Sequence, residues 1–392
     1  MRAKLGQWCQ NLAVSTASLI VCFLVLELFV FRVLLLPDDV LPNVSINNVV
    51  RYMPRTDATF RHPDGRETRV RINNDGWNSM RSDYVQERTP GVKRIAVIGD
   101  SYVHGAFVNT EEGFPEILER QLQANGQRVE VLRFGMDGAP LSQYLHMLRR
   151  EVRSYKPDLV VVQLIHNDFD ESYRLMHNRT GSSFMKLAQS LDKRLVEIPP
   201  VDFKPGFADV LRNSATFRYL YYETNAYLTF KHLISWLYWG GSDEWKPEFV
   251  SSAVDIRNIR DHARNRMFTR YALAEMKALA EQDGFKLAFA MDGVREAIYA
   301  GKPVETYEVG KLNAMARAVA EELELPFLDL QDAFQRDWTQ HRQRFEYEYD
   351  WHWNKRANMI VGKTIARFLL SEPRLLGRTA HSAAPRAMGG ER

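Results

Sequence analysis

The sequence predicts an α/β fold in which helices cover both faces of a central, mostly parallel sheet of five strands. Short runs of apolar, β-branched residues indicate strands buried on both faces, and Ile95–Ile98 is one of them. Segments with the spacing of amphipathic helices follow these runs. This repeating β–α order is typical of a doubly wound, flavodoxin-like three-layer sandwich.

Each expected helix carries apolar residues three and four positions apart. In the helix over 113–125, for example, Phe114, Ile117 and Leu118 share one face. The strands are expected at 95–98, 129–134, 158–165, 285–291 and 326–330, and the helices at 113–125, 140–155, 263–283, 308–323 and 355–370.

Composition narrows the class of protein. The chain has 392 residues, of which 45% are hydrophobic and 26% charged, enough for a substantial globular core. The net charge of +3 is small for this length, so nothing favours a nucleic-acid partner. Cys9 and Cys22 are the only cysteines, and no spacing of His, Cys or carboxylates predicts a metal site. No cofactor is expected.

Residues 12–36 form a long apolar run near the N-terminus. At a rise of about 1.5 Å per residue, a helix of this length spans the hydrocarbon core of a bilayer. Arg32 lies near one end of the run, whereas Glu27 lies deeper and must be protonated or paired. A cleaved signal peptide is the alternative, but no small-x-small cleavage site follows the run. The sequence therefore predicts an uncleaved transmembrane anchor.

Charges on the two sides of this run predict its orientation. Arg2 and Lys4 precede the run, while Asp38 and Asp39 follow it with no Lys or Arg nearby. The positive-inside rule then places residues 1–11 in the cytoplasm and the rest outside. We expect a single-pass protein of the inner (cytoplasmic) membrane, with its main domain in the periplasm of a Gram-negative cell or otherwise extracellular.

Residues 37–91 are expected to form an irregular approach segment that contains a β-hairpin. The alternating run Thr68–Ile72 leads into Asn73–Gly76, and this pattern favours a hairpin that turns at Asp75-Gly76.

The main domain is expected over residues 92–372. Within it, residues 170–261 interrupt the β–α order and are rich in aromatic residues, which predicts a mostly helical insertion. Its aromatic residues either form a lid or sugar-stacking platform, or pack a small core of the insertion itself. Residues 373–392 are rich in Ala, Arg, Gly and Pro and are expected to be disordered.

Polar or glycine residues stand at the ends of the first three expected strands, where open α/β sheets bind their ligands. Ser101 follows the first strand and begins a helix, which makes it a candidate nucleophile. The alternative is that Asp100 or Ser101 only caps that helix. Gly135 and Asn167 stand at the ends of the second and third strands.

A serine nucleophile also needs a base, an acid that orients the base, and donors for the oxyanion. With these needs in view, the chain resembles the SGNH hydrolase superfamily, also called GDSL-type esterases and lipases, over about residues 92–370 outside the insertion. The matching motifs are Gly99-Asp100-Ser101 with Gly105, Phe134–Gly138, Asn167-Asp168, and Asp350 with His352.

The resemblance implies a role for each of these positions. His352 would remove the proton of Ser101, Asp350 would orient the imidazole, and Ser101 would attack an ester carbonyl. The amides of Ser101 and Gly135 and the side chain of Asn167 would form the oxyanion hole.

Two positions differ from the family pattern. Ile165 stands where the third motif, Gly-x-Asn-Asp, has its glycine. The last motif, Asp-x-x-His, is one residue shorter here, as Asp350-Trp351-His352, and Glu348 is another acid nearby. Asp350 is kept as the acid because the form Asp-x-His-Trp-Asn resembles membrane-anchored and polysaccharide-modifying members of the superfamily.

The expected function is that of a membrane-anchored extracytoplasmic serine esterase. Its substrate is expected to be an O-acyl ester, most simply an acetyl ester on a carbohydrate or envelope polysaccharide, or a small ester. One alternative is a polysaccharide O-acetyltransferase that uses the same acyl-serine intermediate. A second is a non-catalytic, glycan-binding subunit of a polysaccharide assembly. The sequence identifies no protein partner.

Overall fold

The computed structural model of the chain describes residues 2–174, 180–223 and 260–376, and these form two compact units. The first unit comprises Met1–Pro42, Ala58–Thr68 and Lys204–Lys246, and the rest of the chain belongs to the second. The second unit holds the sheet and all the candidate site residues.

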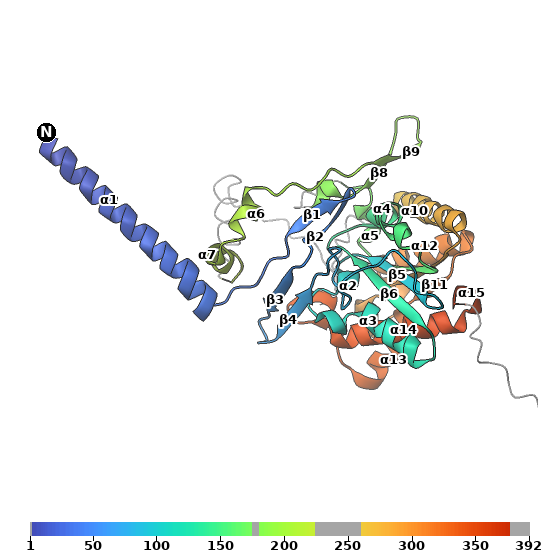
Figure 1. The fold of residues 1–392 in the computed structure, drawn as a ribbon. Helices are drawn as coiled ribbons and strands as arrows, with labels where there is room; N and C mark the ends of the chain where they lie inside the picture. The colour runs from blue at the N-terminus through green and yellow to red at the C-terminus, as the bar shows by residue number, and fades with distance from the viewer. Residues whose placement is uncertain (1, 175–179, 224–259, 377–392) are drawn as a thin grey trace, which may run out of the picture. The chain divides into compact units, whose positions relative to one another are not determined.

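A five-stranded parallel sheet forms the centre of the second unit (Figure 1). Its order is β11-β10-β7-β5-β6, and each neighbouring pair is parallel. Numbered along the chain, this is the order 2-1-3-4-5 of a flavodoxin-like sheet, so the predicted fold class is confirmed. The strands are β5 (Lys93–Gly99), β6 (Val129–Gly135), β7 (Leu159–Leu164), β10 (Lys286–Met291) and β11 (Phe327–Asp329).

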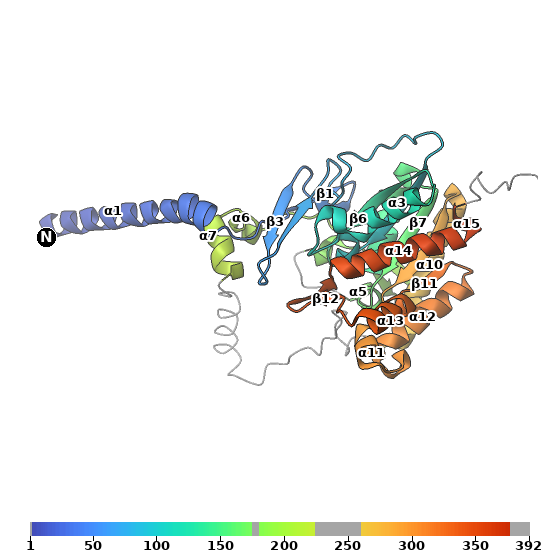
Figure 2. The same ribbon diagram turned by 90° about the horizontal axis from the view of Figure 1, so that it is seen from below.

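Helices cover both faces of this sheet, as the predicted three layers require. The helices α3 (Phe114–Ala124) and α14 (Lys355–Ser371) pack against each other on one face (Figure 2). On the other face lie α4 (Leu141–Arg150), α10 (His262–Asp283) and α12 (Glu308–Glu322) (Figure 1). Apolar side chains of both helical layers pack against the sheet, and the strands β5, β6, β7 and β10 are buried along almost their whole length.

Several elements were not predicted from the sequence, and most of them are too short to display a period. They are α2 (Ser101–His104), α5 (Asp168–Glu171), α11 (Arg295–Ala300), α13 (Gln331–His341), α15 (Pro373–Leu376), β12 (Glu346–Tyr347) and β13 (Asp350–Trp353), together with single 3₁₀ turns at Thr110–Glu112, Val152–Tyr155, Gly181–Ser183 and Val304–Thr306.

The expectation of disorder is wrong for the start of the C-terminal segment. Residues 373–376 form α15, and both Leu375 and Leu376 are buried in the core of the second unit. Burial of two leucines outweighs the polar composition of the segment. Residues 377–392 lie outside the described part of the chain.

The approach segment contains two hairpins. In the first, β1 (Asn43–Ile46) pairs with β2 (Val49–Tyr52) across Asn47-Asn48, whose φ angles of 55° and 60° suit a tight two-residue turn. In the second, β4 (Glu67–Arg71) pairs with the preceding strand β3 (Asp57–Arg61).

The predicted strand over Thr68–Ile72 is therefore present, but its hairpin turn is not at Asp75-Gly76. The chain turns between β3 and β4, where the amides of His62 and Gly65 form turn hydrogen bonds. After β4, only an isolated bridge joins Ile72 to Asn78. The turn beyond the strand exists, with Gly76 at φ 85°, but it is not followed by a second full strand.

The insertion is less helical than expected in its described part. It begins with a β-hairpin, β8 (Lys186–Gln189) and β9 (Leu195–Ile198), followed by the short helices α6 (Phe207–Leu211) and α7 (Ala215–Arg218) and a π-helical turn over Tyr219–Glu223. A charged loop over 190–194 joins the two strands of that hairpin. A helical period gives no indication of such a hairpin. Residues 224–259, with many of the aromatic residues, lie outside the described residues.

The first unit contains the apolar N-terminal helix. It runs as α1 (Arg2–Val25) and continues as a wider π-helical segment over Leu26–Leu34. The stretch Gly6–Leu34 contains an 18-residue window with a mean hydropathy of 2.5, and it is long and apolar enough to cross a membrane, a property that signal sequences share.

Glu27 is paired within this unit. Its carboxylate accepts hydrogen bonds from the hydroxyl of Ser214 at 2.7 Å and from the amides of Ala215 and Thr216 at 2.9 Å each. Arg32 adds an ion pair at 2.9 Å. Of the two alternatives for this acid, the structure has the paired one, in which the carboxylate caps the N-terminus of α7.

Candidate active site

Ser101 lies at the carboxyl edge of the sheet, where β5 passes directly into α2. The carboxylate of Asp100 accepts the amide hydrogen bond of Tyr102 at 2.9 Å, so Asp100 caps this short helix. Gly105 ends the helix in the left-handed conformation, at φ 72°. The hydroxyl of Ser101 is thereby presented at the end of the strand, with 9% of the residue exposed.

Gly135 permits the close approach of β6 to this helix. It stands opposite Gly99 in the register of β5 and β6. A Cβ atom at Gly135 would lie 2.1 Å from the backbone nitrogen of His104, a distance that no side chain tolerates. Only glycine fits at the end of this strand.

His352 and Asp350 lie on one strand of the hairpin formed by β12 and β13. Residues two apart in a strand project to the same side, so the spacing Asp-x-His brings the carboxylate beside the imidazole. Oδ1 of Asp350 lies 2.6 Å from Nδ1 of His352 and also accepts the backbone amide of His352 at 2.7 Å. The shortened motif thus has a direct geometric explanation.

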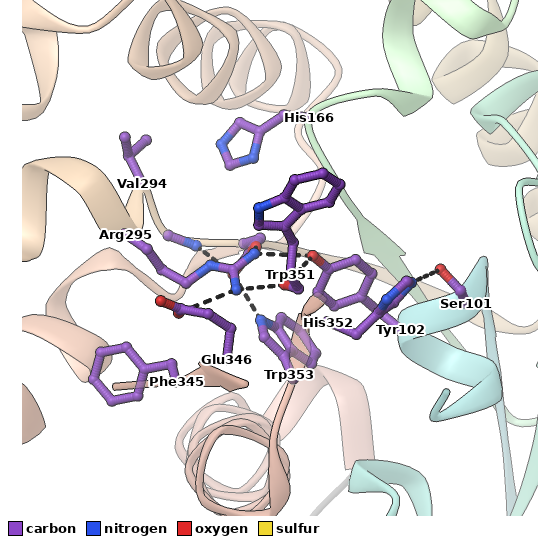
Figure 3. A network of polar contacts seen from close by, with 12 residues as sticks. Ser101, Tyr102, His166, Val294, Arg295, Phe345, Glu346, Trp351, His352 and Trp353 are labelled. Atoms are coloured by element: carbon purple, nitrogen blue, oxygen red, sulfur yellow. Dashed lines mark hydrogen bonds and ion pairs between the residues drawn. The ribbon is translucent and has the colours of Figure 1, made fainter. Parts of the chain in front are cut away.

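The hairpin and α2 meet at the serine (Figure 3). Nε2 of His352 lies 2.7 Å from Oγ of Ser101, across 251 residues of sequence. With Nδ1–H donating to Asp350, Nε2 is free to accept the serine proton. A continuous chain of hydrogen bonds therefore runs from Ser101 through His352 to Asp350, the arrangement needed to activate a serine.

The environment of His352 favours its charged form. Burial lowers the pKa of the imidazole, but the hydrogen bond to Asp350 and the negative charges of Asp350, Asp100 and Asp137 raise it, so the pKa of His352 stands above its ordinary value. A more basic imidazole holds a proton taken from a serine more firmly.

Gly135 and Asn167 lie at the same edge of the sheet as Ser101. The register pairs Gly99 with Gly135, and it pairs Ile98 with Val162 two residues before β7 ends. Asn167 follows three residues after the end of β7. The sheet thus brings the three expected oxyanion-hole positions to one edge, and their donor roles stay a prediction.

A comparison with protein families matches residues 95–218 to a family described as GDSL-like Lipase/Acylhydrolase. The matched segment contains Ser101, Gly135 and Asn167 and ends before Asp350 and His352. Within this segment the chain is similar to GDSL-like hydrolases. This match supports an acyl ester hydrolase of the serine hydrolase type.

Solved structures resemble the chain at low sequence identity. A lipase/acylhydrolase from Enterococcus faecalis has 16% identity and a TM-score of 0.38, over 74% of this chain and 100% of that one. The acetyl xylan esterase AlAXEase has 13% identity and a TM-score of 0.38, over 71% of this chain and 98% of that one. A catalytic mutant of an acetylxylan esterase from Geobacillus stearothermophilus has 14% identity and a TM-score of 0.37, over 75% of this chain and 98% of that one. Values this low identify no substrate. No curated protein matches the chain.

Two buried acids support the loops of the candidate site. Burial raises the pKa of Asp100 to about 7. Burial and the charge of Asp100 raise the pKa of Asp168 well above its ordinary value. Asp168 accepts hydrogen bonds from the hydroxyl of Tyr144 at 2.6 Å and the amide of Ile165 at 2.7 Å, so it shapes the loop that carries Asn167.

The two histidines that adjoin the motifs are buried and engaged elsewhere. Nδ1 of His104 contacts Asp137 at 2.7 Å and the hydroxyl of Tyr52 at 3.0 Å. Burial lowers the pKa of His166 to about 4, and its Nε2 lies 2.8 Å from the side-chain oxygen of Asn313. Neither histidine is bonded to Ser101 in the described structure.

No group of three His, Cys, Asp or Glu residues within the described ranges is placed to hold a metal ion. A hollow of about 310 Å³, lined by residues that include Arg88, Lys156 and Phe285, lies at the amino ends of β7 and β10. Because the strands are parallel, this hollow is at the edge of the sheet remote from Ser101.

The sequence did not single out three residues that contact the candidate site: Tyr102, Phe107 and Arg295. The rings of Tyr102 and Phe107 lie 5.0 and 5.3 Å from the ring of His352. Arg295 is bonded to the peptide between Asp350 and His352. No motif includes Phe107 or Arg295, so the sequence held no signal for either contact.

The raised pKa of His352 predicts a pH dependence. Only the neutral imidazole accepts the serine proton, so kcat/KM should rise with pH through an apparent pKa above the ordinary value of 6.5.

Asp350→Asn removes the partner that raises the pKa of His352, so the apparent pKa should fall and kcat should drop by about 10²- to 10⁴-fold. Glu348→Gln, at an exposed position of the hairpin turn, is the control. An effect of Glu348→Gln as large as that of Asp350→Asn would contradict the assignment.

Proposed function

We propose that the chain is a membrane-anchored, extracytoplasmic serine esterase that removes O-acyl groups, in the first place acetyl groups, from a carbohydrate. The observation that carries this proposal is the hydrogen-bonded chain of Ser101, His352 and Asp350, with distances of 2.7 and 2.6 Å. The proposed catalytic residues are these three, and the proposed oxyanion donors are the amides of Ser101 and Gly135 and the side chain of Asn167.

In the first half-reaction, Oγ of Ser101 attacks the ester carbonyl carbon as its proton passes to Nε2 of His352. Charge moves to the carbonyl oxygen, where the three donors stabilise it. Asp350 holds the imidazolium through Nδ1–H. The carbon–oxygen bond to the alcohol then breaks, and the leaving alkoxide takes the proton from Nε2, which leaves an acyl group on Ser101.

In the second half-reaction, water attacks the acyl group and gives its proton to His352. The tetrahedral intermediate then releases the acid and returns the proton to Ser101. A sugar hydroxyl in place of water would turn the same intermediate into an O-acyl transfer. The residues of the hydrogen-bonded chain perform identical steps in both reactions, so product analysis must separate them.

The surroundings of His352 support a carbohydrate substrate. The ring of Phe107 stacks on His352 at 5.3 Å and lies 6.5 Å from that of Tyr349. Trp351, between Asp350 and His352, is 45% exposed. Aromatic faces of this kind suit the apolar faces of sugar rings. Phe107 also has a φ of 68°, and such strained backbone clusters at functional sites.

A carboxylate near these aromatic side chains supports the same substrate. The side chain of Asp137 is 48% exposed and is held by buried His104 at 2.7 Å. Its charge acts on His352, which places it in the neighbourhood of the proposed base. A fixed, accessible carboxylate accepts hydrogen bonds from sugar hydroxyls.

The proposed setting combines an anchor over 12–36 with a hydrolase domain over 92–372, joined by the approach segment 37–91 and interrupted by the insertion 170–261. The length and mean hydropathy of Gly6–Leu34 support the anchor. Arg2 and Lys4 before it, and Asp38 and Asp39 after it, support a cytoplasmic N-terminus with the hydrolase domain in the periplasm or outside the cell.

A serine-directed fluorophosphonate probe tests the enzymatic role. The full-length protein in detergent should be labelled, and Ser101→Ala should abolish labelling and ester hydrolysis. If the wild-type protein is labelled no better than Ser101→Ala, the chain is a non-catalytic subunit instead.

The products formed from an acetyl donor and an oligosaccharide acceptor separate hydrolysis from transfer. Acetylated oligosaccharide indicates transfer, and free acetate alone indicates hydrolysis.

Substitution of Trp351 tests the carbohydrate substrate. Trp351→Ala removes the exposed indole and leaves the backbone of the hairpin unchanged. The fall in kcat/KM should be about tenfold larger for an O-acetylated oligosaccharide than for p-nitrophenyl acetate, equivalent to about 1.4 kcal/mol of lost contact. Phe207→Ala removes another exposed ring and is the control. Equal losses on both substrates would argue against sugar stacking at Trp351.

Reporter fusions test the topology. Alkaline phosphatase fused after residue 40 should be active, because this enzyme folds only outside the cytoplasm, and green fluorescent protein at the same place should be dark when exported through the general secretory route. If the green fluorescent protein fusion is fluorescent and the alkaline phosphatase fusion is inactive, residue 40 lies in the cytoplasm and the proposed orientation is wrong. Release of the hydrolase as a shortened soluble chain would favour a cleaved signal sequence over an anchor.

A further inference from the structure

A buried arginine lies behind the candidate site, outside the hydrogen-bonded chain of Ser101, His352 and Asp350. Arg295 begins α11, directly after the loop that follows β10, and none of its surface is exposed. Figure 3 shows its guanidinium group among Tyr102, Trp351 and Glu346, on the side of Tyr102 away from Ser101. A charged side chain is placed there only with strong partners, because burial of an unpaired charge is very unfavourable.

The guanidinium group joins the two segments directly. One terminal nitrogen donates to the carbonyl oxygen of Trp351 at 2.6 Å, and the other donates to the hydroxyl of Tyr102 at 2.9 Å. That hydroxyl donates in turn to the same carbonyl oxygen at 3.0 Å. Trp351 lies between Asp350 and His352, and Tyr102 follows Ser101. The closed set of three hydrogen bonds therefore connects the neighbour of the nucleophile with the peptide that precedes the base.

Two carboxylates balance the charge and hold both ends of the hairpin. Arg295 forms ion pairs with Glu346 at 3.4 Å and with Asp292 at 3.6 Å. Glu346 begins β12, and the indole nitrogen of Trp353, at the end of β13, donates to Asp292 at 3.1 Å. Tyr299, also on α11, donates to Glu346 at 2.5 Å. The hairpin is thus held at its first residue, its last residue and the peptide between the acid and the base.

We propose that Arg295 is a positioning residue, which sets the distance between Ser101 and the Asp350–His352 strand through its hydrogen bonds to Trp351 and Tyr102. The inference rests on the proposed function of these three residues. The shortened motif leaves one residue, Trp351, between the acid and the base. The carbonyl oxygen of Trp351 accepts hydrogen bonds from two buried donors, Arg295 and Tyr102.

Lysine cannot replace arginine in this position. The planar guanidinium group presents several donors in a rigid fork, whereas an ammonium group is a point charge on a flexible stem. Arg295→Lys should keep the buried charge beside Asp292 and Glu346 and lose the simultaneous bonds to Trp351 and Tyr102. A displacement of about 1 Å in a reacting group is sufficient for a loss of about 10²-fold in rate.

The test compares Arg295→Lys and Tyr102→Phe with Arg94→Lys, in the full-length protein in detergent. Arg94 is equally buried, but it bonds to Glu130 and to loop carbonyls at the amino ends of the strands, away from the site. Activity is measured per site titrated with the fluorophosphonate, so that unfolded molecules do not count. We expect kcat for p-nitrophenyl acetate to fall by about 10- to 100-fold in Arg295→Lys and about tenfold in Tyr102→Phe, with KM changed less than threefold.

The pH profile provides a second readout. Because Asp350 and His352 lie on the same strand and move together, the apparent pKa in kcat/KM should stay at its wild-type position in Arg295→Lys, unlike in Asp350→Asn. Values of kcat per titrated site within twofold of wild type in both Arg295→Lys and Tyr102→Phe, or a loss no larger than in Arg94→Lys, would overturn the inference.

Amide hydrogen exchange separates this inference from the proposed function, because it needs no activity. Exchange in the segment 345–354 should be at least about tenfold faster in Arg295→Lys than in the wild type, and unchanged there in Arg94→Lys. Unchanged exchange in Arg295→Lys would also overturn the inference. A wild-type protein that neither hydrolyses esters nor reacts with the probe would instead refute the proposed function.

Discussion

The hydrogen bond between Ser101 and His352 is the contact on which the site depends, and nothing local determines its length. The two residues are 251 positions apart and lie on separate elements, the helix α2 and the strand β13. The distance of 2.7 Å between Oγ and Nε2 is set by the packing of the hairpin against α2. Tyr102 lies at the centre of that packing, since its ring contacts those of His352 and Trp353 at 5.0 and 4.8 Å and its hydroxyl bonds to the hairpin backbone.

The sheet contributes the other half of the site. In a parallel sheet all strands end at one edge, so the segments that follow β5, β6 and β7 converge without any contact between them being specified in advance. Close approach is still required, and Gly135 permits it because a Cβ atom there would overlap the backbone of His104. The same convergence gathers negative charge around His352, from Asp350, Asp100 and Asp137, which offsets the effect of burial on its pKa.

The spacing of acid and base illustrates how secondary structure changes the meaning of a motif. In a strand, residues two apart share a side, so Asp-x-His brings the two groups together with no intervening turn. The backbone between them makes its own contacts, because the carbonyl of Trp351 accepts from Arg295 and Tyr102. A motif that is one residue shorter is therefore coupled to a buried charge elsewhere in the chain, on α11 after the fourth strand of the sheet.

The sequence by itself determined the sheet, its strands and most of its long helices, because buried apolar runs and helical periods are properties of contiguous residues. It also singled out Ser101, Gly135, Asn167, Asp350 and His352, since these stand in short motifs at strand ends. It misplaced the turn after β3, missed the β8–β9 hairpin, and held no signal for Arg295 or Phe107. Only the tertiary structure decided the roles of Arg295 and Phe107, because they depend on contacts with the distant hairpin that carries His352, which no local pattern records.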